Sequence, residues 1–209
     1  MSAKEFKVIL TGAFGSGRTS FASSMVKAKK DIKKIPALKT DIYPLDLHTS
    51  AGEVKLKLYD SLLHAKGGLP PTEFFRQSDA ALLFYDITSQ ESYDALETWH
   101  EAIQEANNRK GSAPLPVIVV GTKVDKASSR AIKPKDLEFM KTKGLPYLEI
   151  SSKGGYKLKE LITGLVRSLC GRGIQLTDEI EFEKASVEVD EAKAEEAMKE
   201  YADASKRDN

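Results

Sequence analysis

Short apolar runs alternate with stretches of helical character between residues 6 and 170. Residues 80–87 and 115–121 are almost continuously apolar, which predicts strands covered on both faces, and residues 6–11 and 147–150 are shorter predicted strands. The predicted helices cover residues 19–29, 92–107, 135–143 and 158–170. This alternation is typical of an α/β fold, in which a mostly parallel sheet carries helices on both faces.

One pair of strands breaks the parallel pattern. Residues 45–49 and 54–59 flank the segment Ser50-Ala51-Gly52-Glu53, where the glycine can adopt the positive backbone angle of a hairpin turn. Two strands joined by so short a connection run antiparallel. The hairpin is therefore expected to give the sheet one antiparallel strand at its edge.

The chain changes character after Gly171, where apolar residues become sparse. Residues 190–206 are rich in alanine, glutamate and lysine and begin with Asp190, a suitable helix cap, so they predict a polar tail helix. The sequence thus divides into a domain of residues 1–173 and an acidic tail of residues 174–209.

Charge and apolar content indicate that this tail folds back. From Ile174 onward there are 5 basic and 12 acidic residues, a net charge of −7, whereas the rest of the chain has 27 basic and 19 acidic residues, or +8. The tail is therefore expected to dock on the basic domain, with the helix as its more mobile part. The anchors would be its apolar residues Ile174, Leu176, Ile180 and Phe182.

The composition argues against several classes of protein. With 41% hydrophobic residues, the 209-residue chain can bury an ordinary core, so it is not disordered throughout. It has neither an apolar run of about 18 residues nor a prenylation cysteine, so no membrane anchor is expected. The single cysteine, Cys170, lies in an apolar run and suits the reducing nucleus or cytoplasm. No aromatic stacking motif accompanies the lysines, so direct nucleic-acid binding is not expected either.

A glycine-rich segment lies between the first predicted strand and the first predicted helix. Its sequence, Gly12-Ala13-Phe14-Gly15-Ser16-Gly17-Arg18-Thr19, matches the phosphate-loop pattern, with arginine in place of the usual lysine. Small residues let backbone amides turn toward phosphate oxygens, and the Thr19 hydroxyl can bind Mg²⁺. We therefore predict that this segment, together with Ser20, binds the phosphates of a nucleotide.

Two side chains of the loop depart from the pattern. Arg18 keeps the positive charge, but its planar guanidinium is bulkier than an ammonium group, which is expected to weaken phosphate binding. Phe14 occupies a position that usually holds a small residue facing the terminal phosphate. Two interpretations of Phe14 are open: its ring obstructs the attack of water on that phosphate, or it folds onto the nearby surface.

Two later segments are suited to recognising a nucleobase. In Gly121-Thr122-Lys123-Val124-Asp125, the Asp125 carboxylate can accept from the ring N–H and the amine of guanine, a donor pair that adenine lacks. Lys123 can lay its methylene stem on the purine, and Thr122 can tie this loop to the phosphate loop. Ser151-Ser152-Lys153 follows the last strand and offers a backbone amide to the guanine oxygen. Together with the phosphate loop, in this order, these segments predict guanine recognition.

In these three segments the sequence resembles the small GTPases of the Ras superfamily. Longer strings resemble the Ran branch of nuclear-transport GTPases, namely Tyr43-Pro44-Leu45-Asp46-Leu47-His48-Thr49, Lys66-Gly67-Gly68-Leu69, Thr98-Trp99-His100 and residues 143–151. The resemblance spans residues 6–171 and extends to the tail helix. It implies a six-stranded sheet, bound GTP or GDP with Mg²⁺, and regulatory or effector proteins as partners, including transport receptors. It also implies a monomer located in the nucleus and cytoplasm.

Departures from the family concentrate around the terminal phosphate of GTP. Asp60 matches the aspartate that binds Mg²⁺ through water, but Leu63 replaces a glycine and His64 replaces the water-orienting glutamine. Ala37 aligns with the Mg²⁺-binding threonine of the first switch segment. His64 is the candidate catalytic residue. These departures are expected to impair GTP hydrolysis more than guanine recognition.

Three hypotheses follow. In the first, the chain is a Ran-like guanine-nucleotide-binding protein with weak or absent GTP hydrolysis, acting through protein partners. In the second, it is a competent GTPase in which His64 positions the attacking water. In the third, it is an adaptor that binds no nucleotide and uses the fold as an interaction surface. Phe14, Arg18 and Leu63 favour the third hypothesis, and the intact base-reading residues oppose it.

Overall fold

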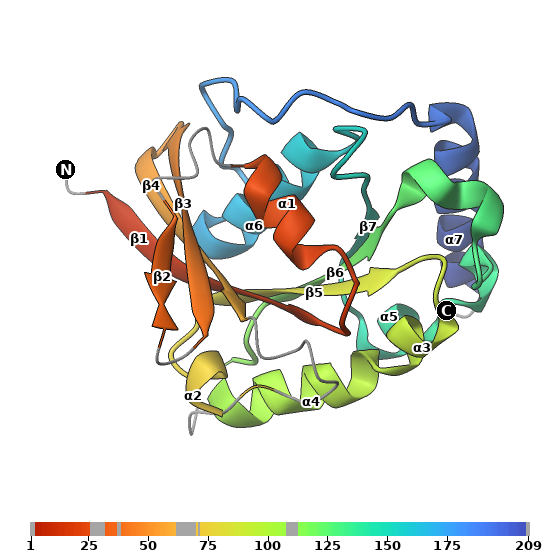
Figure 1. Cartoon of the computed structure of the whole chain (residues 1–209), viewed down its shortest axis with the longest axis horizontal. Coiled ribbons are helices and arrows are strands. Elements are labelled where there is room, and N and C mark those ends of the chain that lie inside the picture. The colour runs from red at the N-terminus through yellow and green to blue at the C-terminus, as the bar shows by residue number, and fades with distance from the viewer. Residues whose placement is uncertain are drawn as a thin grey trace.

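The computed structural model describes residues 3–25, 32–36, 39–61, 70, 72–107 and 113–207. Over this part of the chain, seven strands form one sheet in the order β2-β3-β4-β1-β5-β6-β7, with helices on both faces (Figure 1). The strands are β1 (Lys4–Gly12), β2 (Lys33–Ile35), β3 (Thr40–Thr49), β4 (Gly52–Ser61), β5 (Ala80–Asp86), β6 (Val117–Thr122) and β7 (Tyr147–Glu149). The predicted α/β fold is confirmed, but the sheet has seven strands rather than six.

The additional strand is β2, three residues that pair antiparallel with the start of β3. β3 also runs antiparallel to β4 through the predicted hairpin, in which Gly52 adopts a φ of +108°. β3 is thus the antiparallel strand, but it lies second from the edge because β2 covers it. The predicted antiparallel edge of the sheet is therefore confirmed, with the short β2 added outside β3.

The other strands run parallel to one another, with β1 between β4 and β5. Successive side chains of a strand point to opposite faces, so the neighbours Ile9 and Leu10 belong to different hydrophobic clusters. Parallel strands also end at one common edge of the sheet. The loops after β1, β4, β5, β6 and β7 therefore come together at that edge.

The helices cover the two faces of the sheet (Figure 1). α1 (Arg18–Ser24) and α6 (Leu158–Cys170) pack on one face, and the other carries α2 (Thr72–Phe75), α3 (Gln90–Asp94), α4 (Leu96–Asn107) and α5 (Glu138–Lys143). Two 3₁₀ segments, η4 (Val124–Ser129) and η5 (Pro134–Asp136), follow β6. The helix predicted at residues 92–107 begins earlier, because Ser89 caps the backbone N–H of Ser92, and it is interrupted at Ala95. No helix in the described part of the chain is long and apolar enough to span a bilayer.

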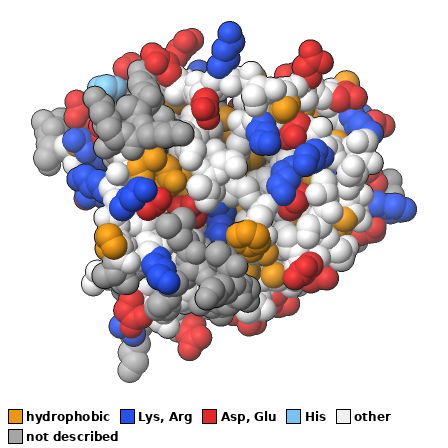
Figure 2. All heavy atoms as spheres, in the orientation of Figure 1, with side chains coloured by type: hydrophobic (Ala, Val, Ile, Leu, Met, Phe, Trp, Pro, Cys, Tyr) orange, Lys and Arg blue, Asp and Glu red, His pale blue; other side chains and the backbone are white. Residues whose placement is uncertain are grey.

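The first half of the tail lies on the domain as an extended strap. Its backbone bonds to the β3–β4 hairpin, where Ser50 N–H donates to Gln175 at 2.9 Å and Thr177 N–H donates to His48 at 3.0 Å. Further along, Glu183 N–H donates to the carbonyl of Ser24 at the end of α1, at 2.9 Å. The predicted anchors Ile174, Leu176, Ile180 and Phe182 all pack against the hydrophobic cluster beneath. Figure 2 shows basic and acidic side chains interspersed on this face of the molecule, and the strap is held by apolar packing and backbone hydrogen bonds.

The tail ends in α7 (Glu191–Arg207), which lies at the far end of the sheet beside β7, η4 and η5 (Figure 1). Ala194 is fully buried against this surface, and the ring of Tyr201 meets the ring of Tyr147 edge-on, with centroids 4.9 Å apart. The polar tail helix therefore docks through one narrow apolar stripe.

Substituting Ala194 with glutamate is expected to detach α7, because a carboxylate would be buried without a partner. Unfolding should become easier by roughly 1–3 kcal/mol, and amide hydrogen exchange should accelerate in α7 and at its contacts with β7. Ala192→Glu is the matched control, since Ala192 is exposed on the same helix. Equal exchange in the two variants would show that Ala194 does not hold the helix in place.

Candidate functional site

A cavity of about 380 Å³ opens at the common edge of the parallel strands. Its walls come from the loop after β1 and the loops after β6 and β7, and consist of Phe14, Gly15, Ser16, Gly17, Arg18, Thr19, Ser20, Thr122, Lys123, Asp125, Lys126, Ser152 and Lys153. The predicted binding residues therefore meet around one space, apart from Gly12, Ala13 and Ser151, which do not line it. Lys126 is a lining residue that was not predicted.

The glycines of the first loop serve different purposes. Gly15 and Gly17 have φ angles of +78° and +91°, and a Cβ on Gly17 would approach the hydroxyl of Thr122 to 3.2 Å. Gly12 lies away from the cavity, and a Cβ there would come within 2.1 Å of the carbonyl oxygen of Phe84 on β5. Gly12 is thus required for the packing of β1 against β5, whereas Gly15 and Gly17 shape the cavity wall.

Thr19 and Asp60, the two predicted Mg²⁺ ligands, lie side by side. The Thr19 hydroxyl donates to Oδ2 of Asp60 at 2.5 Å, and Asp60 is fully buried at the end of β4. Its other carboxylate oxygen, Oδ1, is buried and has no hydrogen-bond partner among the residues that the structure describes. Burial raises the pKa of the Asp60 carboxyl, and the Thr19 hydrogen bond and the Arg18 charge oppose that rise. A hydroxyl beside a carboxylate with an unused buried oxygen fits a hard cation such as Mg²⁺.

Arg18 and Phe14 occupy opposite environments within the same loop. Arg18 is buried, and this burial lowers the pKa of its guanidinium, although the charge of Asp60 partly compensates. Phe14 is 70% exposed while lining the cavity. A ring folded onto the nearby surface would be far more covered, so the exposure of Phe14 favours the interpretation in which its ring stands at the cavity mouth.

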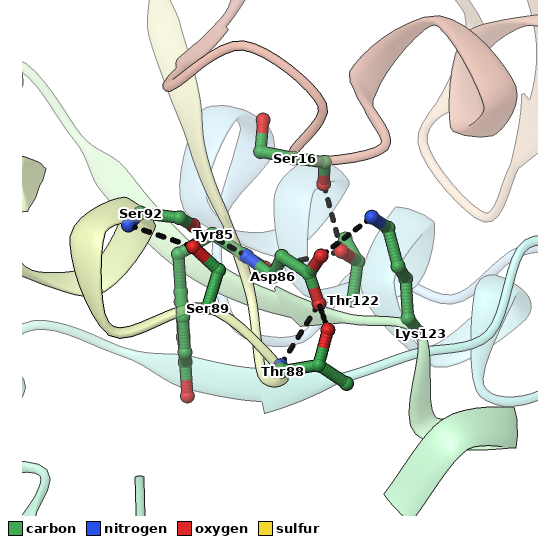
Figure 3. A network of polar contacts seen from close by, with 8 residues as sticks. All are labelled: Ser16, Tyr85, Asp86, Thr88, Ser89, Ser92, Thr122 and Lys123. Atoms are coloured by element: carbon green, nitrogen blue, oxygen red, sulfur yellow. Dashed lines mark hydrogen bonds and ion pairs between the residues drawn. The ribbon is translucent and has the colours of Figure 1, made fainter. Parts of the chain in front are cut away.

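Thr122 connects the first loop to the loop after β6. Its hydroxyl lies 2.7 Å from the carbonyl oxygen of Ser16 and 3.1 Å from that of Tyr85 (Figure 3). The bond predicted between the two loops is therefore present. It fixes the spacing between the phosphate-loop wall and the opposite wall of the cavity.

Asp125 is oriented by the second polar loop. The hydroxyl of Ser151 donates to Oδ1 of Asp125 at 2.5 Å and accepts from the N–H of Gly154 at 3.0 Å. Ser151 is completely buried and lies behind Asp125 instead of lining the cavity. Ser151 thus holds a lining residue in place, while Ser152 and Lys153 face the cavity themselves.

One carboxylate that the sequence did not predict is bonded to the cavity-lining Lys123. Asp86, at the end of β5, accepts from Nζ of Lys123 at 2.5 Å and from the hydroxyl of Thr88 at 2.7 Å (Figure 3). Burial alone would raise the pKa of Asp86, but the bonds from Lys123 and Thr88 outweigh it and lower that pKa. The available signal was its position, because strand ends collect functional side chains at this edge.

Three residues singled out in the sequence, Ala37, Leu63 and His64, lie outside the residues that the structure describes. Their placement relative to the cavity therefore remains a sequence-based prediction.

A glycine loop between a strand and a helix, together with polar loops after β6 and β7 at the same edge of a largely parallel sheet, defines a P-loop nucleotide-binding domain. The sequence model of the Ras family matches residues 7–171. The chain therefore belongs to the Ras family, whose members are small GTPases that bind guanine nucleotides with Mg²⁺.

Proposed function

We propose that this chain is a Ran-like protein that binds GTP or GDP with Mg²⁺, hydrolyses GTP weakly or not at all, and acts through protein partners. The observation that carries the proposal is that phosphate-loop residues and base-reading residues line the same cavity. That arrangement has one end suited to phosphates and one end suited to a purine.

Each wall of the cavity has a distinct role in this proposal. The loop of residues 14–20 binds the phosphates through its backbone amides and Arg18. Asp125 and Lys123 bind the guanine, and Lys153 lines the guanine-binding end of the cavity. Thr19 and Asp60 hold Mg²⁺, which when bound neutralises charge on the phosphate oxygens.

Weak hydrolysis is inferred from the residues near the terminal phosphate. The exposed ring of Phe14 at the cavity mouth supports an obstruction to water or to an arginine supplied by a partner. The sequence also replaces the usual glycine and glutamine by Leu63 and His64. Binding without turnover leaves a protein that signals by the nucleotide it holds and the partners it engages.

The Ran-like role is inferred from the sequence strings quoted above and from the tail. We propose regulatory or effector proteins as partners, transport-receptor-like ones among them, a location in nucleus and cytoplasm, and a monomer in their absence. Direct nucleic-acid binding is not part of the proposal, because no aromatic stacking motif accompanies the lysines of the sequence.

Denaturing freshly purified protein is the most direct test of nucleotide binding. We expect the supernatant to contain GDP or GTP in an amount comparable to the protein, identified by chromatography against nucleotide standards. Protein that releases no nucleotide, and binds none after incubation with GTP and Mg²⁺, would instead support the nucleotide-free adaptor.

Hydrolysis is expected to be slow in the wild-type chain. Replacing both Leu63→Gly and His64→Gln should accelerate single-turnover GTP hydrolysis by at least roughly tenfold, since a water-positioning group and a phosphate-facing amide would be regained. Rates measured with enzyme in excess separate the chemical step from nucleotide exchange. Rapid wild-type hydrolysis that His64→Ala abolishes would favour the competent GTPase in which His64 positions water.

A further inference from the structure

A carboxylate outside the recognised motifs holds the lysine of the base-reading loop. Asp86 ends β5, and Figure 3 shows its carboxylate between Thr88 and Lys123. Oδ2 accepts from Nζ of Lys123 at 2.5 Å, while Oδ1 accepts from the N–H and the hydroxyl of Thr88 at 2.9 and 2.7 Å. Both carboxylate oxygens are therefore engaged, and Asp86 is not among the described residues that line the cavity.

The carboxylate is itself well fixed. Its side chain is only 10% exposed, and the backbone N–H of Asp86 donates to the hydroxyl of Ser92 at 2.7 Å. Ser92 in turn donates its N–H to Ser89, the cap of α3, at 3.2 Å. The end of β5 is thus tied to the start of α3, which gives Lys123 a rigid partner.

Lys123 has the opposite character, because it reaches the cavity. It lines the cavity wall and has a left-handed backbone with a φ of +66°, which directs the chain into η4. A lysine side chain is a flexible methylene stem that ends in a point charge. Lys123 thus lines the cavity, as Asp125 does, while its ammonium group is bonded to Asp86.

We propose that Asp86 is a positioning residue for guanine binding, which fixes the stem of Lys123 as the apolar surface against which the purine ring packs. This inference rests on the proposed binding of guanine nucleotides in this cavity. Asp125 would select the base by its edge, whereas the Asp86–Lys123 pair would act on the face of the ring. Disturbing the pair should therefore weaken binding without changing the preference between bases that differ only at the edge.

The test compares GDP with inosine diphosphate, which lacks the exocyclic amine of guanine but has the same ring face. Asp86→Asn in the full-length chain preserves shape, yet its amide would place donors next to the lysine ammonium. We expect both nucleotides to bind on the order of tenfold more weakly, with the ratio of their Kd values unchanged. Asp79→Asn is the matched control at the other end of β5, where the carboxylate accepts from the backbone of Lys7.

A double-substitution cycle distinguishes positioning from a general structural role. Lys123→Met keeps an unbranched stem but removes the ammonium group, so adding Asp86→Asn to it should change GDP binding by less than about twofold. The proposal would be overturned if Asp86→Asn lowered GDP affinity equally in the wild type and in Lys123→Met. A changed ratio of the Kd values for GDP and inosine diphosphate would overturn it as well. Thermal unfolding of each variant shows that the fold is retained. Wild-type protein that binds neither nucleotide would overturn the proposed function together with this inference.

Discussion

Replacing Asp125 with alanine is expected to weaken GDP binding at least about 30-fold. The carboxylate offers two acceptors to the adjacent ring N–H and amine of guanine, and losing such a charged pair costs roughly 2–3 kcal/mol. Asp125 lines the cavity, and the Ser151 hydroxyl fixes its direction. Much of the binding energy is therefore expected to depend on this one side chain.

Titrations with GDP and ADP, on the wild type and on Asp125→Ala, measure this effect. The wild type should prefer GDP, and the variant should bind the two nucleotides with similar, weak affinity, because adenine never used the carboxylate. Asp136→Ala serves as the control, since Asp136 is exposed in the neighbouring η5. An unchanged GDP affinity in Asp125→Ala would remove the base-reading role from this residue.

The sequence alone predicted those parts of the site in which the functional residues follow one another in a short segment. Gly15 to Thr19 and Thr122 to Asp125 are short segments in which residue types, spacing and adjacent strands all agree, and the structure places both around the cavity. Gly12 belongs to the same pattern but serves strand packing instead. A sequence pattern does not distinguish a glycine needed for a ligand from one needed for a neighbouring strand.

Features that depend on distant neighbours were not predictable in this way. The strand β2 consists of two lysines and an isoleucine, with no apolar run, and it exists because its backbone pairs with residues 40–42. Asp86 acquires its role only when β5 lies beside β6 and brings Lys123 within reach. In each case, tertiary pairing overrides a weak local signal.

The ion pair between Arg130 and Glu149 is a third such feature, and it joins the end of η4 to the end of β7. Nη1 and Nη2 of Arg130 donate to Oε1 and Oε2 of Glu149 at 2.8 and 2.6 Å, and the Tyr147 hydroxyl also donates to Oε1, at 2.6 Å. The side chains of Glu149 and Arg130 are only 1% and 12% exposed. Burial opposes the charge of Arg130, but the bonds and charge of Glu149 outweigh it and raise the Arg130 pKa.

Arg130→Met is therefore expected to destabilise the chain by about 3–5 kcal/mol, because it leaves the Glu149 carboxylate buried without its counter-charge. Adding Glu149→Gln should recover much of that loss, since the neutral amide can still accept from Tyr147. Lys57→Met is the matched control: Lys57 and Glu5 are also 2.6 Å apart, but their side chains are 36% and 52% exposed, so the cost should stay below about 1 kcal/mol.

Urea denaturation of the wild type, Arg130→Met, the double variant and Lys57→Met gives the free energies of unfolding that test this prediction. Because Arg130 ends the segment that follows Asp125, and Glu149 precedes Ser151 by two residues, the pair also fixes the distance between the two base-reading loops. The single variant should consequently lose GDP affinity even where it remains folded, and the double variant should regain stability more fully than affinity. A cost for Arg130→Met no larger than that for Lys57→Met would mean that water reaches Glu149 and that the pair contributes as little as one on the surface.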